Sequence, residues 1–380
     1  MRRNIKRMFA ILFVSALALT LVACGGGSAK ENHTVRVGIH SNEGGATLFA
    51  VAQDQGYFEE QGLTIELTVV ESGPAEMAAM RADNRSLDVG YIGAGVSWNA
   101  IDDFGNRLRF IYLDCLSNSE MFIANPAKKP GINKDSTWNE LYEALKGSTV
   151  AIPTDTTPGS WFKMFLEKVN NLAGPGETPV VDADKLWIHS ETDAYLEGYV
   201  APNNNEANKI TVVTESNEYL PQAYKEYDFV AGFAPATTSV LASGGVEVAT
   251  TSSHLPENSF PSTWVASEKW MLENPAVVQK FINALAKATE WRSKNLEKSL
   301  RLAETLLQVN QNTFTADSLI APSAKELYNW FATYDGLGYI YFNGMYKDKV
   351  NNVPAGNRAK TLPEALEVSY MLKGLSEVIK

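Results

Sequence analysis

Cysteine and histidine are too scarce in this sequence to build a disulfide framework or a metal centre. Cys24 and Cys115 are the two cysteines among 380 residues, and the four histidines are scattered without the H-E-x-x-H spacing of a zinc site. A glycine-rich phosphate loop followed by lysine is also missing. We therefore expect neither a metal nor another cofactor.

Positive charge is also in short supply. The chain has 33 lysines and arginines against 44 aspartates and glutamates, which gives a formal net charge of −11. Basic residues cluster only at the very start of the chain, and a nucleic-acid backbone is recognised through such clusters. Nucleic acid is therefore not an expected partner.

No apolar run reaches the roughly 20 residues that a bilayer span needs. The longest, at 8–22, follows a basic start and precedes a Gly-Gly-Gly-Ser sequence at 25–28, which is typical of a cleaved export signal. We predict a signal peptide at 1–23 and a flexible linker at 24–34. The residues before the linker, Leu-Val-Ala-Cys at 21–24, resemble a bacterial lipobox.

This resemblance implies that Cys24 carries lipid, including palmitate, and becomes the first residue of the mature protein. The protein would then be exported and anchored to the cell membrane by its lipid, facing the periplasm or the cell exterior. An ordinary signal peptide with an incidental cysteine is the alternative.

Two stretches of the chain repeat one order of elements. Each begins with a strand, a polar loop and an apolar helix, at 35–39, 40–45 and 46–56 and again at 149–152, 153–159 and 160–172. Each continues with a strand, loop and helix and a closing strand, at 63–70, 71–74, 75–82 and 87–93 and again at 210–213, 214–217, 220–227 and 228–235. This alternation predicts an α/β fold with doubly wound, mainly parallel sheets.

The chain is also longer than one compact core usually supports, so we expect two lobes. The first comprises 35–120 plus 265–380, and the second comprises 121–264. In open α/β sheets ligands bind outside the carboxyl ends of the strands, which places a ligand cleft between the lobes.

The loops at these strand ends supply the candidate ligand-binding residues. Those of the first lobe are Ser41, Asn42, Glu43, Gly93, Ala94, Gly95 and Ser119. Those of the second lobe are Asp155, Thr156, Thr157, Ser216, Phe233 and Pro235. Turn and cap chemistry alone is the alternative explanation for each polar loop.

Four segments resemble the periplasmic solute-binding proteins of ABC importers. They are Val-Gly-Ile at 37–39, an apolar helix leading into Gly-Tyr-Phe-Glu-Glu-Gln-Gly-Leu at 48–63, Leu-Asp-Val-Gly-Tyr-Ile-Gly at 87–93, and the segment at 228–235. The nearest branch is the nitrate, sulfonate and taurine group, which includes the NMT1/THI5-like proteins. The resemblance covers roughly residues 35–300.

This resemblance implies the type II periplasmic-binding-protein fold and a binding protein rather than an enzyme. Such a protein is a monomer that closes over one small solute and delivers it to a membrane permease. By resemblance, the ligand-contacting positions are the loop near Ser41 and the segments at 93–95, 156–159 and 233–235. The closing motion would bend the chain where it crosses between lobes, which we place at 121–124 and 262–265.

The candidate cleft loops contain acidic residues and neither lysine nor arginine. The acidic residues are Glu43, Glu71, Glu120, Asp155 and Glu215. This balance favours a small organic solute with an amine or a heteroaromatic ring, such as a thiamine precursor or a taurine-like zwitterion. The alternatives are that these acids only cap helices, that the ligand is an alkanesulfonate or nitrate held by helix N-termini, or that the protein is an enzyme of the pyrimidine-synthase type.

Two segments depart from the family pattern. We expect a solvated surface loop for the insertion at 174–207. The tail at 319–380 is predicted to form helices that pack on the first lobe.

Overall fold

The computed structural model describes residues 32–81, 86–93, 96, 108–192, 196, 204–256, 259–343 and 365–380, all within one unit, Asn32–Lys380. The predicted signal peptide and the predicted lipid site Cys24 lie outside these residues. Within these ranges no helix combines the length and the hydropathy of a membrane span.

The first sheet has six strands in the order β12-β4-β11-β3-β1-β2. In chain order they are β1 (His33–His40), β2 (Leu63–Val70), β3 (Val89–Ile92), β4 (Leu108–Ser117), β11 (Phe260–Ser267) and β12 (Leu319–Ile320). The strands β1, β2 and β3 pair in parallel, whereas β11 runs antiparallel to β3 and β4. β-branched residues alternate along β1, where Val35, Val37 and Ile39 are fully buried.

The second sheet repeats this pattern in the order β10-β5-β9-β6-β8-β7. Its strands are β5 (Met121–Ala124), β6 (Thr149–Ile152), β7 (Trp187–Ser190), β8 (Lys209–Thr214), β9 (Phe229–Gly232) and β10 (Val246–Thr250). The four strands from β9 to β7 are parallel, and β5 is antiparallel to both of its neighbours. These two mixed, mainly parallel sheets confirm the predicted fold class.

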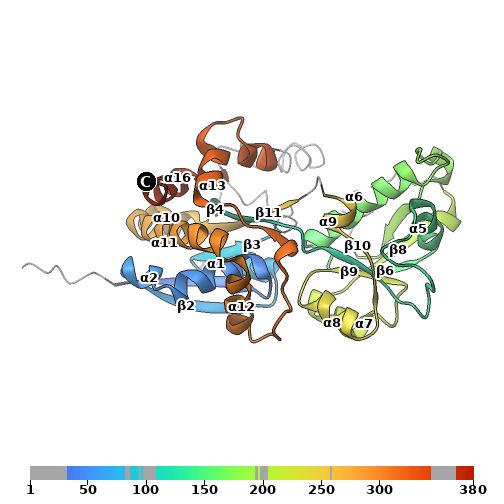
Figure 1. Cartoon of the computed structure of the whole chain (residues 1–380), viewed down its shortest axis with the longest axis horizontal. Helices are drawn as coiled ribbons and strands as arrows, with labels where there is room; N and C mark the ends of the chain where they lie inside the picture. The colour runs from blue at the N-terminus through green and yellow to red at the C-terminus, as the bar shows by residue number, and fades with distance from the viewer. Residues whose placement is uncertain are drawn as a thin grey trace, which may run out of the picture. The chain divides into compact units, whose positions relative to one another are not determined.

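Helices cover both sheets (Figure 1). Those with the first sheet are α1 (Glu43–Asp54), α2 (Tyr57–Glu60), α3 (Gly73–Arg81), α10 (Glu268–Glu273), α11 (Pro275–Lys294), α12 (Leu296–Leu307), α13 (Ala324–Ala332) and α16 (Ser369–Val378). Those with the second are α5 (Trp138–Leu145), α6 (Thr157–Leu172), α7 (Leu220–Ala223), α8 (Ala236–Ala242) and α9 (Thr251–His254). The helix predicted at 220–227 is therefore shorter than expected.

Part of the insertion at 174–207 is a strand, so the prediction of a surface loop was wrong there. Residues 187–190 form β7, which pairs in parallel with β8 and buries Ile188 completely. The preceding residue Leu186 is held by Asn170 of α6, whose amide donates to its carbonyl at 3.0 Å and accepts from its N–H at 2.9 Å. The sequence signal was weak because the apolar run at 186–188 is only three residues long and is flanked by Lys185 and His189.

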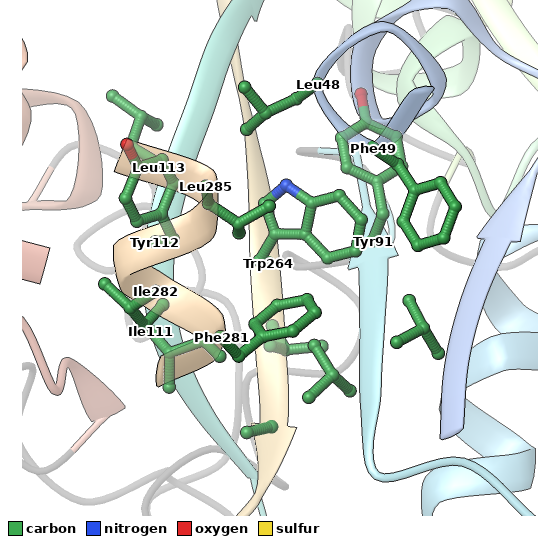
Figure 2. Packing of buried hydrophobic residues seen from close by; sticks show 14 of the residues in the cluster. Leu48, Phe49, Tyr91, Ile111, Tyr112, Leu113, Trp264, Phe281, Ile282 and Leu285 are labelled. Atoms are coloured by element: carbon green, nitrogen blue, oxygen red, sulfur yellow. The ribbon is translucent and has the colours of Figure 1, made fainter. Parts of the chain in front are cut away.

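The two sheets have separate aromatic cores. In the first, the Trp264 indole lies edge-on to Tyr91 and Phe281 at centroid distances of 5.7 and 5.8 Å, as Figure 2 shows. In the second, Phe122 stacks on Phe229 at 4.7 Å and contacts Phe165 at 5.4 Å. Residues of α13 and α16 belong to the first core, so these two helices of the tail pack as predicted. The prediction was wrong at 319–320, which form the strand β12 of the first sheet.

The chain passes between the sheets at 118–120 and between His254 and Phe260. The predicted hinge positions, 121–124 and 262–265, lie inside β5 and β11, where ladder pairing holds the backbone. Residues 260–264, which the expected boundary gives to the second lobe, belong to β11 of the first sheet. The chain therefore crosses between the sheets a few residues before each predicted hinge position.

A buried ion pair connects four elements of the first lobe. Asp114 of β4 and Arg292 of α11 have fully buried side chains, and Nη1 of Arg292 lies 2.5 Å from Oδ1 of Asp114. Nη1 also donates to Thr47 of α1 at 3.0 Å, and the indole N–H of Trp264 in β11 donates to Oδ2 of Asp114 at 2.7 Å. The pair therefore fixes the packing of both helices on the sheet.

Replacing Arg292 should destabilise the protein strongly. Arg292→Met leaves the charge of Asp114 buried without a partner, and we expect the free energy of unfolding to fall by about 3–5 kcal/mol. Adding Asp114→Asn should recover much of this loss, because the amide is neutral and still accepts from Trp264. Urea titrations of the three proteins test the prediction, and a single variant as stable as the parent would contradict it.

Candidate functional site

A cavity of about 260 Å³ lies where the strands of both sheets end. The residues that line it from the first lobe and its crossing are His40, Asn42, Glu71, Ser72, Gly73, Pro74, Gly93, Val96, Ser117, Ser119, Glu120 and Ser262. Those from the second lobe are Pro153, Thr154, Asp155, Thr156, Thr157, Thr214, Glu215, Ser216, Asn217, Glu218 and Phe233. This size suits a small organic molecule, since a water molecule occupies about 30 Å³ of liquid.

Most of the predicted site residues lie on this cavity. The structure brings together Asn42, Gly93, Ser119, Asp155, Thr156, Thr157, Ser216 and Phe233. Ser41, Glu43 and Pro235 are not among the lining residues, and Ala94 and Gly95 lie outside the residues that the structure describes. The lining residues that were not among the candidates include His40, Thr214, Glu218 and Ser262. His40 and Thr214 could have been found, because each is the first residue of a predicted polar loop at a strand end, at 40–45 and 214–217.

Asn42 caps a helix in addition to lining the cavity. Its side-chain oxygen caps α1 by accepting from the N–H of Gly44 at 2.7 Å, and it also accepts from the Tyr91 hydroxyl at 3.1 Å. A Cβ atom on Gly45 would lie 2.2 Å from the Tyr91 ring, so the helix can begin this close to β3 only with glycine there. The cap interpretation is therefore correct for Asn42, although the residue also faces the cavity.

Two carboxyl groups near the cavity are almost fully buried. Glu120 is 2% exposed and accepts from the Thr251 hydroxyl at 2.8 Å and from the Ser117 hydroxyl at 3.3 Å. Glu43, at the start of α1, is 1% exposed, and its Oε2 has no hydrogen-bond partner within the described ranges. Burial is the main cause that raises the pKa of Glu43 to about 7, and the charge of Glu120 contributes in the same direction. A backbone hydrogen bond and the hydroxyls of Ser119 and Ser318 oppose this shift.

The cavity wall is strongly acidic. Glu71, Glu120, Asp155, Glu215 and Glu218 line it, and the described lining residues include no lysine or arginine. Of the acidic residues in the predicted site loops, all but Glu43 line this cavity. Desolvation raises the pKa of Glu218, and repulsion from Glu71 of the other lobe raises it as well. The charge of His40 opposes this shift. Glu218 is nevertheless an exposed residue, which limits the effect of desolvation.

Glu43 should make the stability depend on pH in an unusual direction. Its folded pKa is above its unfolded value of 4.5, so the folded state holds the extra proton between about pH 4.5 and 7. Stability from this group is complete below the unfolded pKa and is lost as the pH rises through about 7. Glu43→Gln should therefore exceed the parent in stability at pH 8 by up to about 3 kcal/mol and match it near pH 4.5.

Thermal and urea unfolding at both pH values test this prediction. The control is Glu273→Gln, which changes an exposed carboxylate outside the cavity and should leave the profile unchanged. A Glu43→Gln difference that does not depend on pH, or a parent that is the more stable protein at pH 8, would contradict it.

Known proteins resemble this chain over most of its length. The sequence model of the NMT1-like family matches residues 28–307. A protein of Brucella abortus strain 2308 that is named a binding protein is 24% identical over 298 residues, which are 78% of this chain and 78% of that protein.

Solved structures share the fold at lower identity. The periplasmic nitrate-binding protein NrtA of Synechocystis PCC 6803 is 11% identical with a TM-score of 0.63, over 92% of this chain and 90% of that chain. The ligand-binding component of an ABC-type import system of Staphylococcus aureus is 12% identical with a TM-score of 0.62, over 90% and 99%. The chain therefore belongs to the NMT1-like family and has the two-lobe fold of the periplasmic binding proteins.

Proposed function

We propose that this protein is the exported solute-binding component of an ABC importer and that its solute is a small organic molecule with a cationic group. An amine, a zwitterion or a heteroaromatic base fits this description. The observation that supports this proposal most directly is the composition of the cavity wall. It has five carboxyl groups and no lysine or arginine among its described residues. The solute would be released unchanged to the permease.

Repulsion within the cavity supports a cationic ligand. Glu71 follows β2 of the first lobe and Glu218 follows β8 of the second, and each disfavours the charge of the other. A cation between them would replace this repulsion with two attractions and would draw the lobes together. Phe233 adds an aromatic ring at the wall, and such rings attract cations.

An anion is the second candidate, because a nitrate-binding protein shares the fold. The N-terminus of α6 reaches the cavity at Thr156 and Thr157, and the Thr156 side chain does not cap it. Helix N-termini can bind a sulfonate or nitrate without a basic side chain. The surrounding carboxylates would oppose this binding, so the charge of the ligand decides between the two proposals.

Removing one carboxylate should weaken the binding of a cationic solute. Purified protein is screened by thermal shift against amines, pyrimidines, sulfonates and nitrate, and the hits are titrated by calorimetry. We expect Asp155→Asn and Glu71→Gln each to lower affinity for a cationic hit by about tenfold to a hundredfold, because each keeps its size and loses a charge-assisted contact. Glu273→Gln is the matched control outside the cavity.

Three results would count against this function. Unchanged or tighter binding in both variants would favour an anion held at helix N-termini. Chemical conversion of the hit by the purified protein would favour the enzyme. Absence of any thermal shift across the panel would contradict a solute of these classes.

We also propose that lipid on Cys24 anchors the protein to the membrane. Cys24→Ala should then move the protein from the membrane fraction to the soluble fraction, since lipid chains alone would hold it there. Cys115→Ala is the control, because Cys115 is fully buried in β4 and is not available for modification. Intact-mass measurement completes the test, and a parent protein without added lipid mass would contradict the anchor.

A further inference from the structure

A histidine paired with a buried carboxyl group faces the cavity. His40, the last residue of β1, is 6% exposed, and its Nδ1 lies 2.7 Å from Oε2 of Glu76 in α3. Glu76 is fully buried, and its Oε1 accepts from the N–H of Tyr91 at 3.2 Å. In the part of the chain that the structure describes, His40 is the one basic side chain in an ion pair with Glu76.

The number of protons that His40 and Glu76 hold between them determines whether Nε2 of His40 carries one. Both oxygens of Glu76 meet a nitrogen, so the carboxyl group is either ionised or donates its own proton to Nδ1. Burial favours a pair without net charge, because an uncompensated charge in a low dielectric is unfavourable. The two neutral arrangements, imidazolium with carboxylate and imidazole with carboxylic acid, both leave a proton on Nε2 of His40.

The surroundings direct this proton to the cavity. The ring of His40 packs at 5.3 Å from Tyr91 and lies edge-on at 6.3 Å from Phe233 of the second lobe. Nε2 has no hydrogen-bond partner among the described residues, whereas Nδ1 is occupied by Glu76. Glu218 is also in electrostatic range of His40 but forms no ion pair with it in the described ranges.

We propose that His40, oriented by Glu76, donates a hydrogen bond from Nε2 to an acceptor on the solute, and that the solute therefore carries an acceptor such as a carboxylate beside its cationic group. This inference rests on the proposed function. The carboxylates of the wall bind the cationic end, and His40 selects the other end. Glu76 is a positioning residue, because it touches His40 and not the cavity.

Matched probes test the selection by His40. The probes are γ-aminobutyrate with butylamine and β-alanine with propylamine, which share the ammonium and differ in the carboxylate. The parent should bind each amino acid about tenfold to a hundredfold more tightly than its amine. The variant His40→Phe/Glu76→Gln, which removes the donor without leaving a buried charge, should bind both members of a pair equally.

Glu215→Gln, which changes another carboxylate of the cavity wall, is the matched control. It removes a carboxylate for the ammonium end, so affinity for both members of a pair should fall while their ratio is kept. A ratio near one in the parent, or a ratio that survives in the double variant, would overturn the proposal. Because each result is a ratio within one protein, a general loss of stability does not imitate it.

Nitrogen NMR of labelled histidine tests the donor without any ligand. The signals of His40 are those that disappear in the His40→Phe/Glu76→Gln variant. Nε2 should carry a proton in the parent, and Glu76→Gln should lose this fixed assignment because the carboxyl group that pairs with Nδ1 is gone. An unprotonated Nε2 in the parent would overturn the proposal. Failure of all four probes to bind would contradict the cationic solute of the proposed function instead, and the NMR result would then decide on His40 alone.

Discussion

The site depends on one geometric constraint: the parallel strands of both sheets end at the same cavity. Backbone groups and side chains at such ends are not used by the sheet ladder, so polar residues collect there and remain available to a ligand. His40, Glu71 and Gly93 reach the cavity at or just after the ends of β1, β2 and β3, and Pro153 and Phe233 follow β6 and β9. The fold thereby sets the place of the site, and the loop residues set its charge.

The acidic charge of these residues lowers the stability of the protein and, in the proposed function, supports the binding of a solute. Glu43 and Glu120 are buried carboxyl groups, and burial raises the pKa of both. Repulsion among the carboxyl groups of this region can be relieved by a proton or by a cation. The acidic wall that lowers the stability of the protein is therefore also the feature that supports the proposal of a positively charged solute. The Asp114–Arg292 pair shows the contrast, because there each buried charge has its partner inside the protein.

The sequence predicted the repeated halves because β-branched strands and polar loops recur in one order, and it predicted most of the cavity loops for the same reason. It missed β7 because the apolar run at 186–188 is only three residues long and lies in a segment that departs from the family pattern. The sequence could not show that Glu71 lines the cavity and Glu43 does not. Both residues follow strands, and only the packing of α1 distinguishes them. The partnership of His40 with Glu76 joins residues 36 positions apart and has no local sequence signal.

The central claim is that the cavity holds a small solute with a positive charge. The most direct measurement is native mass spectrometry of the protein purified without denaturant, followed by identification of any small molecule that is released on unfolding. The account predicts a bound amine, zwitterion or heteroaromatic base whose acceptor group accompanies its cationic group. A bound sulfonate, nitrate or other simple anion would contradict it.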